Sequence, residues 1–345
     1  MYYFVTFRNF VTENMKKVAI NGFGRIGRAV FKVMMSDPKK YQVVAINDLA
    51  DLDNLVYLLK YDSAQGRYDK KVEIKGGKLS VNGKLIPFYS IAEPQKLPWK
   101  KHKVDVVLEC TGVFTKKEDA AKHLKAGAKN VIISAPTKSD GIATVVRGVN
   151  TEAAKKQGIV ANASCTTNCT GPVMAVLESA FGIEKALLTT VHAVTASQRT
   201  VDLPVAKDWR RGRSVLNNII PTTTGAAIAT ALTLPSLKDK FDGVSIRVPM
   251  ITGSLIDVVA LLKKNTTVEE VNKVFEQYSK KSHFKGILEV THEELVSSDI
   301  IGTTASAIVD LKFTKVVDGN LVKILAWYDN EWGYANRLAE MALEV

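Results

Sequence analysis

The sequence predicts an α/β fold: a doubly wound parallel sheet, followed by a second domain of the α+β class. Short apolar runs alternate with helical patterns over the first half of the chain, which is typical of parallel strands joined by crossover helices. A glycine-rich turn joins the first predicted strand to the first predicted helix. Beyond residue 165 the pattern changes to longer strands with alternating apolar positions, flanked by helices.

Length and composition limit the classes of protein to consider. The chain has 345 residues, enough for two domains, with 46% hydrophobic and 24% charged residues. No apolar run reaches the roughly 18 residues of a membrane span, so no membrane partner is expected. The three cysteines give no disulfide framework, which favours a reducing cytoplasm. We predict no metal ligands.

Residues 1–14 are predicted to be an N-terminal extension. They lack the long apolar core and small-residue cleavage site of a signal peptide. Met15 begins a strong strand pattern, so a translation start at Met15 is an alternative to a start at Met1.

The net charge of +12 indicates an anionic partner. The lysines are scattered in pairs, without a long basic block or an aromatic stripe. Nucleic acid is therefore not favoured as the main partner, because the footprint of nucleic-acid binding is clustered. Sites for phosphorylated small molecules on a basic surface fit this pattern better.

The segment Asn21–Arg28 carries the pattern G-x-G-x-x-G between a strand and a helix. Gly22 allows the tight turn, Gly24 lets a pyrophosphate approach the backbone, and Gly27 lets helix and strand pack closely. The next strand ends at Asp48, where an acid binds the adenosine ribose and repels a 2′-phosphate. This predicts a Rossmann-type domain that binds NAD rather than NADP.

Further strands are predicted at 104–112, 130–136 and 143–146, with glycine turns marking an antiparallel hairpin insertion near 76–83. Ligands of such sheets bind at the carboxyl ends of the strands. Thr111, Ser134 and Cys165 follow such ends and are expected to face one crevice. Cys110 is interpreted as a core residue.

In the second half, strands are predicted at 186–192, 245–249 and 255–261, a capping box opens a helix at Thr267, and a hairpin covers 316–321. The final helix, from about Glu331, has an apolar face. We expect an extension at 1–14, an NAD-binding domain at 15–164 completed by helix 331–345, and a catalytic domain at 165–330. The irregular segment 195–218 is long enough to be functional or interfacial.

Cys165 follows an apolar strand and begins a helical pattern. Unpaired N–H groups and the helix dipole at that position favour thiolate over thiol, which makes a cysteine nucleophilic. The alternative is a small buried core cysteine. Cys169, one turn later, is interpreted as structural.

A base is needed beside such a nucleophile. His192 ends an apolar strand in a polar loop, whereas the other four histidines lie among charged residues. A hydrogen-bonded core histidine is an equally good interpretation of His192, and spacing alone does not join it to Cys165.

Five segments occur together in one known enzyme family: Asn21–Arg28, Ala163–Cys169, the strand ending in His192, Pro221–Ala227 and Trp327–Glu331. In this order and spacing they resemble the phosphorylating glyceraldehyde-3-phosphate dehydrogenases over essentially all of residues 15–345. The resemblance implies a homotetrameric enzyme that uses NAD, glyceraldehyde 3-phosphate and inorganic phosphate.

The resemblance also implies a thioester mechanism. Cys165 would attack the aldehyde, and His192 would take the hydroxyl proton as hydride passes to NAD. Inorganic phosphate would then attack the thioester and release 1,3-bisphosphoglycerate. The Cys165 N–H and the His192 imidazole would hold the developing oxyanion.

Further ligands follow from the motifs and the resemblance. The cofactor is expected to contact Gly22, Gly24, Arg25, Ile26, Gly27, Asp48, Thr111, Ser134 and Asn330. The substrate phosphate is expected to contact Thr195 and Arg247. The attacking phosphate is expected to contact Ser164, Thr166, Arg211, Thr224 and Gly225. Arg210 and Arg213 remain alternatives to Arg211.

The sequence departs from many family members at Ala92, where they carry an arginine near the adenine. Two other functions stay open. An erythrose-4-phosphate dehydrogenase would share the cysteine motif but hydrolyse its thioester, and the intact Thr223-Thr224-Gly225 favours the phosphate-dependent enzyme. A nucleic-acid-binding protein is the alternative from a different class.

Overall fold

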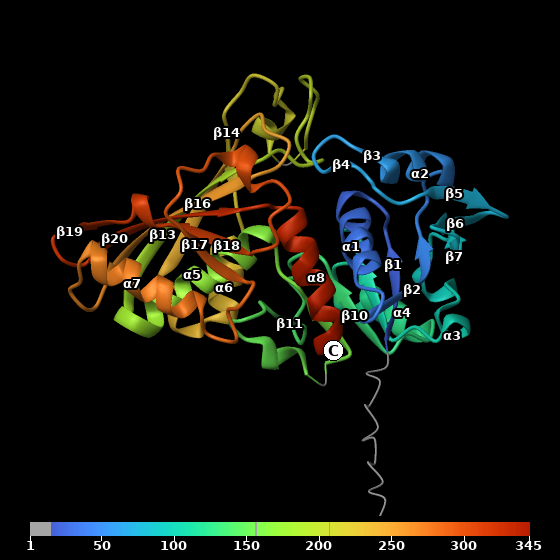
Figure 1. Ribbon diagram of the computed structural model, residues 1–345, viewed down its shortest axis with the longest axis horizontal. Coiled ribbons are helices and arrows are strands. Elements are labelled where there is room, and N and C mark those ends of the chain that lie inside the picture. The colour runs from blue at the N-terminus through green and yellow to red at the C-terminus, as the bar shows by residue number, and fades with distance from the viewer. Residues whose placement is uncertain (1–14, 156, 207) are drawn as a thin grey trace, which may run out of the picture.

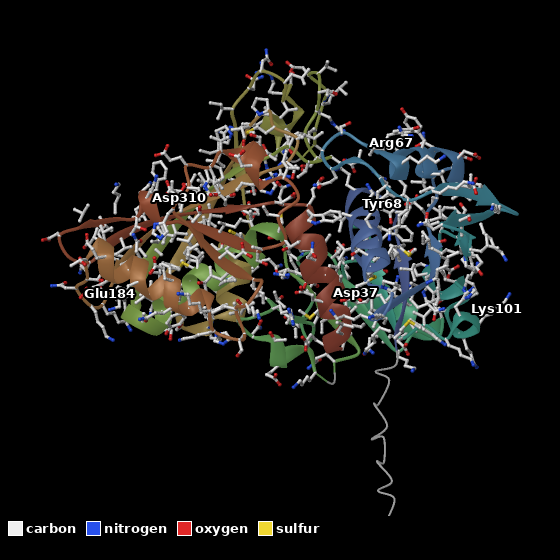
Figure 2. All side chains as sticks on the ribbon, in the orientation of Figure 1. Asp37, Arg67, Tyr68, Lys101, Glu184 and Asp310 are labelled. Atoms are coloured by element: carbon white, nitrogen blue, oxygen red, sulfur yellow. The ribbon has the colours of Figure 1, made fainter. Side chains whose placement is uncertain are left out.

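The computed structural model describes residues 15–155, 157–206 and 208–345, so the predicted extension at 1–14 lies outside the described residues. Figure 1 shows two halves side by side, each built around its own sheet. Figure 2 adds the side chains, with the exposed Lys101 on the N-terminal half and the exposed Glu184 on the C-terminal half. Within the described ranges no helix is both long and apolar enough to cross a membrane.

The N-terminal half contains a seven-stranded sheet in which every pairing is parallel. Its strands, in spatial order, are β11 (Ala143–Thr144), β12 (Ile159–Ala161), β10 (Asn130–Ile133), β9 (Val106–Glu109), β1 (Lys16–Asn21), β2 (Tyr41–Asn47) and β8 (Phe88–Tyr89). The order reverses between β1 and β9, and this switch point is where ligands of such sheets bind. The predicted doubly wound sheet is confirmed.

Two cores cover the faces of this sheet because neighbouring residues of a strand point to opposite sides. Val18 and Ile20 of β1 pack in one core with α1 (Arg25–Ser36) and α2 (Leu52–Lys60), while Ala19 packs in the other with α3 (Trp99–His102) and α4 (Lys117–Lys125). The sheet is therefore buried on both sides, as parallel sheets generally are.

Small antiparallel pieces lie beside this sheet. The predicted hairpin insertion is a three-stranded sheet of β5 (Val72–Lys75), β6 (Lys78–Val81) and β7 (Lys84–Ile86), and a second pair joins β3 (Tyr61–Asp62) to β4 (Gly66–Arg67). The strand predicted at 143–146 is shorter than expected. The Val146 N–H donates to Asn150 Oδ1 at 2.8 Å and so leaves the strand ladder.

The C-terminal half contains a mixed sheet. Its strands, in spatial order, are β14 (Ile220–Thr223), β15 (Phe241–Arg247), β13 (Ile183–His192), β16 (Ser254–Leu262), β20 (Leu321–Tyr328), β18 (Ala307–Asp310) and β17 (Leu288–Thr291), with β19 (Lys315–Val317) paired to β20. One face packs against α5 (Cys165–Phe181), α6 (Ala226–Thr233) and α7 (Val268–Ser279). The predicted capping box at Thr267 is present at the start of α7.

The last helix, α8 (Trp332–Glu344), returns to the N-terminal half and packs against α1. Its predicted apolar face is buried there through Leu338, Met341 and Ala342. The Tyr334 hydroxyl donates to the Ala163 carbonyl oxygen at 3.2 Å, so α8 also supports the turn that precedes Cys165. The segment 195–218 projects from the C-terminal half, and its described residues hold a short 3₁₀ turn, Trp209–Gly212, and one isolated β-bridge between Arg199 and Ser214.

Candidate functional site

Cys165 lies at the first position of α5, immediately after β12 and a tight turn. Ala163 in this turn has a φ of 53°, a left-handed conformation that is uncommon for a residue other than glycine. Ser164 caps the helix, because its side chain accepts the Thr167 N–H at 3.1 Å. The Cys165 thiol therefore faces the unpaired N–H groups of the first turn.

His192 is the last residue of β13, and its Nε2 lies 3.4 Å from the Cys165 Sγ. The two residues are 27 positions apart, and the packing of α5 against the sheet brings them together. His192 is buried, and the Tyr328 ring packs edge-on against the imidazole with centroids 6.0 Å apart. A cysteine–histidine pair of this kind can move a proton between sulfur and nitrogen.

Arg247 stands beside His192 because the two residues are register partners on the parallel strands β13 and β15. Its Nη1 lies 2.6 Å from His192 Nδ1 and 3.0 Å from the Ala193 carbonyl oxygen, which is itself 2.6 Å from Nδ1. A guanidinium only donates, so Nδ1 either accepts from Arg247 or donates to Ala193. In the first case the Nε2–H faces the sulfur, and in the second a lone pair does.

Burial dominates the electrostatics of this pair. Burial and the neighbouring Arg247 charge lower the pKa of His192 to about 3, so the imidazole is neutral near pH 7. Burial also raises the pKa of the Cys165 thiol, outweighing Arg247 and the N–H groups of the helix start, which lower it. The N–H groups of the helix start do favour the thiolate, as expected, but burial outweighs them, so a neutral thiol faces a neutral imidazole near pH 7.

Tyr328 is a residue of the site to which sequence reasoning assigned no role. Its hydroxyl lies 3.0 Å from Thr166 Oγ1 and 2.9 Å from Thr190 Oγ1, and it is fully buried. The Thr166 hydroxyl, expected to contact phosphate, is thus occupied by Tyr328 in this structure. The alternation of buried positions along β20 was the available signal, since it points Tyr328 inward.

The other expected phosphate ligands lie at the ends of separate strands and helices of the C-terminal half. Thr195 follows β13 and is exposed, with its hydroxyl 3.0 Å from Gln198 Oε1. Thr224 and Gly225 precede α6. The Ala226 N–H donates to Thr224 Oγ1 at 3.1 Å, and the other N–H groups of the first turn have no partner within the helix. Arg211 Nε lies 2.9 Å from Thr222 Oγ1, and its charge contributes to lowering the pKa of Arg247.

Arg213, one of the alternatives to Arg211, has a different environment. It pairs with Asp202 at 2.9 Å on the exposed part of the segment 195–218. Arg211 is also paired, with Asp208 at 3.2 Å, but unlike Arg213 it contacts Thr222 of β14 as well.

The glycine-rich turn fits a dinucleotide pyrophosphate. A Cβ at Gly27 would lie 2.1 Å from the Gly22 carbonyl oxygen, and a Cβ at Gly22 would lie 2.7 Å from the Thr111 nitrogen. Gly24, by contrast, faces open space and leaves the start of α1 without a side-chain cap. The backbone there offers N–H groups to an anion that can approach closely.

The remaining expected cofactor residues line the same edge of the sheet. Asp48 follows β2 and accepts the Phe23 N–H at 2.6 Å, which ties it to the glycine-rich turn. Thr111 and Ser134 follow β9 and β10. The buried Asn330 follows β20, and its Oδ1 accepts the Ser254 hydroxyl at 2.7 Å. Ile26 lies in the first turn of α1, beside Arg25.

Arg25 is expected to contact the cofactor, but its guanidinium is already bound to Glu331 and Asp62. These contacts connect α1 to the segment before α8. Among the described residues, no cluster of three or more His, Cys, Asp or Glu side chains could hold a metal ion.

Fold and site together define the class of protein: a dinucleotide-dependent oxidoreductase with a cysteine–histidine pair beside the cofactor crevice. Family comparisons identify it further. Residues 16–117 match the model of the glyceraldehyde 3-phosphate dehydrogenase NAD binding domain, and residues 164–330 match that of the C-terminal domain. The chain belongs to the glyceraldehyde 3-phosphate dehydrogenase family, and its cofactor is NAD.

Curated relatives agree with this assignment. The chain is 51% identical over 328 residues to the glyceraldehyde-3-phosphate dehydrogenase of Geobacillus stearothermophilus, covering 94% of this chain and 97% of the relative. It is 49% identical over 331 residues to that of Streptomyces coelicolor, covering 95% and 98%. It is 48% identical over 328 residues to glyceraldehyde-3-phosphate dehydrogenase 1 of Bacillus subtilis, covering 94% and 97%.

Two glycine variants separate folding from cofactor binding. Gly27→Ala should lower the free energy of unfolding by about 1–3 kcal/mol, because its Cβ is forced against backbone. Gly24→Ala should leave that free energy within about 0.5 kcal/mol, yet weaken NAD binding, because the methyl group occupies the approach of the pyrophosphate. Urea unfolding and NAD titration measure the two effects. Unchanged NAD affinity in Gly24→Ala would place the pyrophosphate elsewhere.

The low pKa of His192 makes stability depend on pH. Between pH 6.5 and about pH 3, His192 is protonated in the unfolded chain but stays neutral in the folded protein, because its pKa is 6.5 in the first and about 3 in the second. The free energy of unfolding therefore decreases as the pH is lowered through this range. At pH 5 this cost is about 2 kcal/mol, at about 1.4 kcal/mol per pH unit. His192→Asn should remove that part of the decline between pH 7 and pH 5 in urea unfolding, while the exposed His283→Asn controls for losing one histidine. Parallel slopes for His192→Asn and wild type would contradict the assignment.

Proposed function

We propose that the protein oxidises glyceraldehyde 3-phosphate to 1,3-bisphosphoglycerate with NAD and inorganic phosphate, through a thioester on Cys165. The observation that carries this proposal is the 3.4 Å contact between Cys165 Sγ and His192 Nε2 at the start of α5, with Arg247 alongside. The names of the relatives from Geobacillus stearothermophilus and Bacillus subtilis support the substrate.

The first half of the reaction forms the thioester. The Cys165 sulfur bonds to the aldehyde carbon while its proton passes through His192 Nε2 to the carbonyl oxygen, giving a thiohemiacetal. The N–H groups at the start of α5 stabilise the oxyanion that develops on the way. His192 then takes the hydroxyl proton as the carbon loses a hydride, which leaves a thioester on Cys165. Bound NAD supplies the nicotinamide ring that accepts the hydride.

The second half releases the product. A phosphate oxygen attacks the thioester carbon, and the carbon–sulfur bond breaks to give an acyl phosphate. The sulfur leaves as a thiolate and recovers a proton from His192, while the proton of the attacking hydrogen phosphate goes to solvent. The burial that raises the pKa of Cys165 favours this return to the neutral thiol.

Substrate binding also decides which ring nitrogen of His192 carries the proton. A substrate phosphate would take the Arg247 donors, because a doubly charged oxyanion is a stronger acceptor than a neutral imidazole. The His192 Nδ1–H would then donate to the Ala193 carbonyl, which leaves the Nε2 lone pair facing the Cys165 thiol. The imidazole thus becomes a base when substrate is in place.

The attacking phosphate would bind where the uncapped start of α6 meets Arg211. The first turn of α6, where only the Ala226 N–H is bonded to the Thr224 hydroxyl, and a guanidinium suit a phosphate, and the nearby Arg247 adds positive charge. This arrangement favours phosphate over water as the second nucleophile, and therefore the phosphorylating enzyme over the hydrolytic alternative.

Phosphate dependence tests the proposed function. NADH formation from glyceraldehyde 3-phosphate should require added phosphate. Arg211→Met should raise the phosphate KM at least about tenfold, because a lost charge-assisted hydrogen bond costs about 1.5–3 kcal/mol. Arg213→Met is the matched control and should leave that KM unchanged. NADH formation that is independent of phosphate would contradict the proposal.

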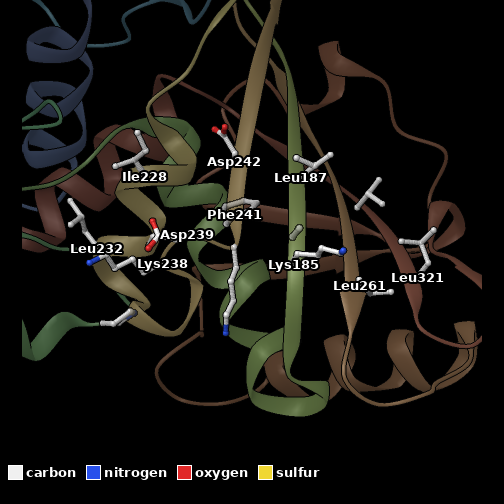
Figure 3. A pocket seen from close by; sticks show the side chains of 15 residues that line it. Lys185, Leu187, Ile228, Leu232, Lys238, Asp239, Phe241, Asp242, Leu261 and Leu321 are labelled. Carbon is white, nitrogen blue, oxygen red and sulfur yellow. The ribbon is translucent and has the colours of Figure 1, made fainter.

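We also propose that the protein is a homotetramer, as the family resemblance implies, and the exposed apolar face of the C-terminal sheet supports its self-association. Leu187, Val244 and Leu321 are exposed on this sheet, and Ile228 and Leu232 of α6 are exposed beside it. A groove of about 1110 Å³ is lined by Leu187 and Leu321 of the sheet and by Ile228 and Leu232 of α6 (Figure 3). Large apolar patches on a globular surface mark interaction sites, and a second copy of the chain offers the same apolar face.

A single charge tests this interface. Leu187→Asp places a carboxylate on the apolar face and should reduce the mass of the assembly in light scattering at micromolar concentration. Lys101→Asp, on the exposed surface of the N-terminal half, is the control and should not. An unchanged mass for Leu187→Asp would exclude this face from the interface.

We further propose that residues 15–164 with the helix at 331–345 form the NAD-binding domain and residues 165–330 the catalytic domain. Two separate hydrophobic cores support this division, since α8 packs in the first and α5 to α7 pack in the second. Free cysteines at Cys110, Cys165 and Cys169 support a reducing, cytoplasmic location.

A further inference from the structure

A chain of buried polar side chains crosses the floor of the cofactor crevice and has no part in the proposed chemistry. Asn21, Asn47 and Glu109 are the last residues of β1, β2 and β9 and are register partners on these three neighbouring strands. Each is at most 4% exposed. Buried polar groups are costly unless they are hydrogen-bonded, so their partners decide what this chain does.

The Glu109 carboxylate accepts four hydrogen bonds. Its Oε2 accepts from Asn21 Nδ2 at 2.6 Å and from His123 Nε2 at 3.0 Å. Its Oε1 accepts from the Thr111 N–H at 2.8 Å and from the Thr111 hydroxyl. Four bonds fill the acceptor capacity of a carboxylate. Glu109 therefore joins the glycine-rich turn on one side to the loop after β9 on the other.

The contact between Trp99 and His123 decides which groups donate and which accept in this set of hydrogen bonds. The Trp99 indole N–H donates to His123 Nδ1 at 3.0 Å, and an indole nitrogen can only donate. The His123 Nδ1 must therefore accept, which places the imidazole proton on Nε2, where it donates to Glu109. Both His123 and Trp99 are completely buried, so no water competes for these groups.

The hydrogen bonds continue from Asn21 through Asn47 to the segment that departs from the family pattern. Asn21 Oδ1 accepts from Asn47 Nδ2 at 2.7 Å. Asn47 in turn accepts the Ile91 N–H at 2.9 Å and donates to the Ile91 carbonyl oxygen at 3.0 Å. Ile91 immediately precedes Ala92. One connected set of hydrogen bonds thus spans from Thr111 to Ile91.

We propose that Glu109 is a positioning residue for NAD: its carboxylate holds the Thr111 loop, the glycine-rich turn and the Ile91 segment in one fixed arrangement. This inference rests on the proposed cofactor crevice. The spacing of the two loops is tight, since a Cβ at Gly22 would lie 2.7 Å from the Thr111 nitrogen. A small displacement of Thr111 would therefore change the walls against which the cofactor packs.

Glu109→Gln replaces one of the two acceptor oxygens of the carboxylate with an NH₂ group. A carboxamide has one acceptor oxygen, and its NH₂ group must face one of the two donor pairs. The Thr111 hydroxyl can rotate to accept from it, but the Thr111 N–H cannot. The Thr111 loop should therefore be released, while the contacts to Asn21 and His123 persist.

Direct NAD titration of the purified apoprotein tests this inference. Glu109→Gln should raise the NAD dissociation constant at least about fivefold and speed hydrogen exchange at the Thr111 amide, with kcat at saturating NAD within about twofold of wild type. The matched control is Val107→Ala, a buried position two residues earlier on β9 whose apolar side chain takes no part in the hydrogen bonds of this set. It should lose stability and keep wild-type NAD affinity.

Equal NAD affinity in Glu109→Gln and wild type would overturn the inference, and so would an equal loss of affinity in Val107→Ala. If Glu109→Gln does not fold, His123→Gln, which keeps a donor for Glu109, should bind NAD more tightly than His123→Leu, which does not. Equal binding by these two variants would also overturn the inference. A wild-type protein that fails to bind NAD would instead overturn the proposed function.

Discussion

The contact between the Cys165 sulfur and the His192 imidazole is the interaction on which the rest of the site depends. It exists only because the start of α5 and the end of β13 meet where the two sheets approach each other. The register of β13 and β15 adds Arg247 to the same point. From the opposite side, α8 supports the turn before Cys165 through Tyr334. One contact thus requires both hydrophobic cores to be formed.

Burial gives this contact its chemical character. In water, a cysteine and a histidine near neutral pH would each be partly ionised. Here the low-polarity surroundings lower the pKa of His192 and raise that of Cys165, so both are held neutral. A neutral imidazole is free to accept a proton, which a permanent ion pair would not allow. The N–H groups at the helix start still act on the sulfur, but they stabilise the negative charge that develops during the reaction rather than a thiolate before it.

The sequence predicted what depends on local pattern. The strand–helix alternation, the glycine-rich turn and the capping box at Thr267 are set by neighbouring residues, and the structure contains all three. The pairing of Cys165 with His192 could not be derived from spacing, because it depends on how α5 packs against a sheet. The raised pKa of the Cys165 thiol could not be predicted either, because the sequence indicates the start of a helix but not how deeply the thiol is buried there. The roles of Tyr328 and Glu109 could not be predicted, because their partners Thr166 and Asn21 lie 162 and 88 positions away along the chain.

The central claim is that Cys165 carries the acyl group between two half-reactions, and mass spectrometry tests it most directly. Protein incubated with glyceraldehyde 3-phosphate and NAD, without phosphate, should gain the mass of one 3-phosphoglyceroyl group on the peptide containing Cys165. Adding phosphate should remove that mass and release acyl phosphate in equal amount. An acyl group on Cys169 or Cys110, or NADH formed with no adduct and no need for Cys165, would contradict the account.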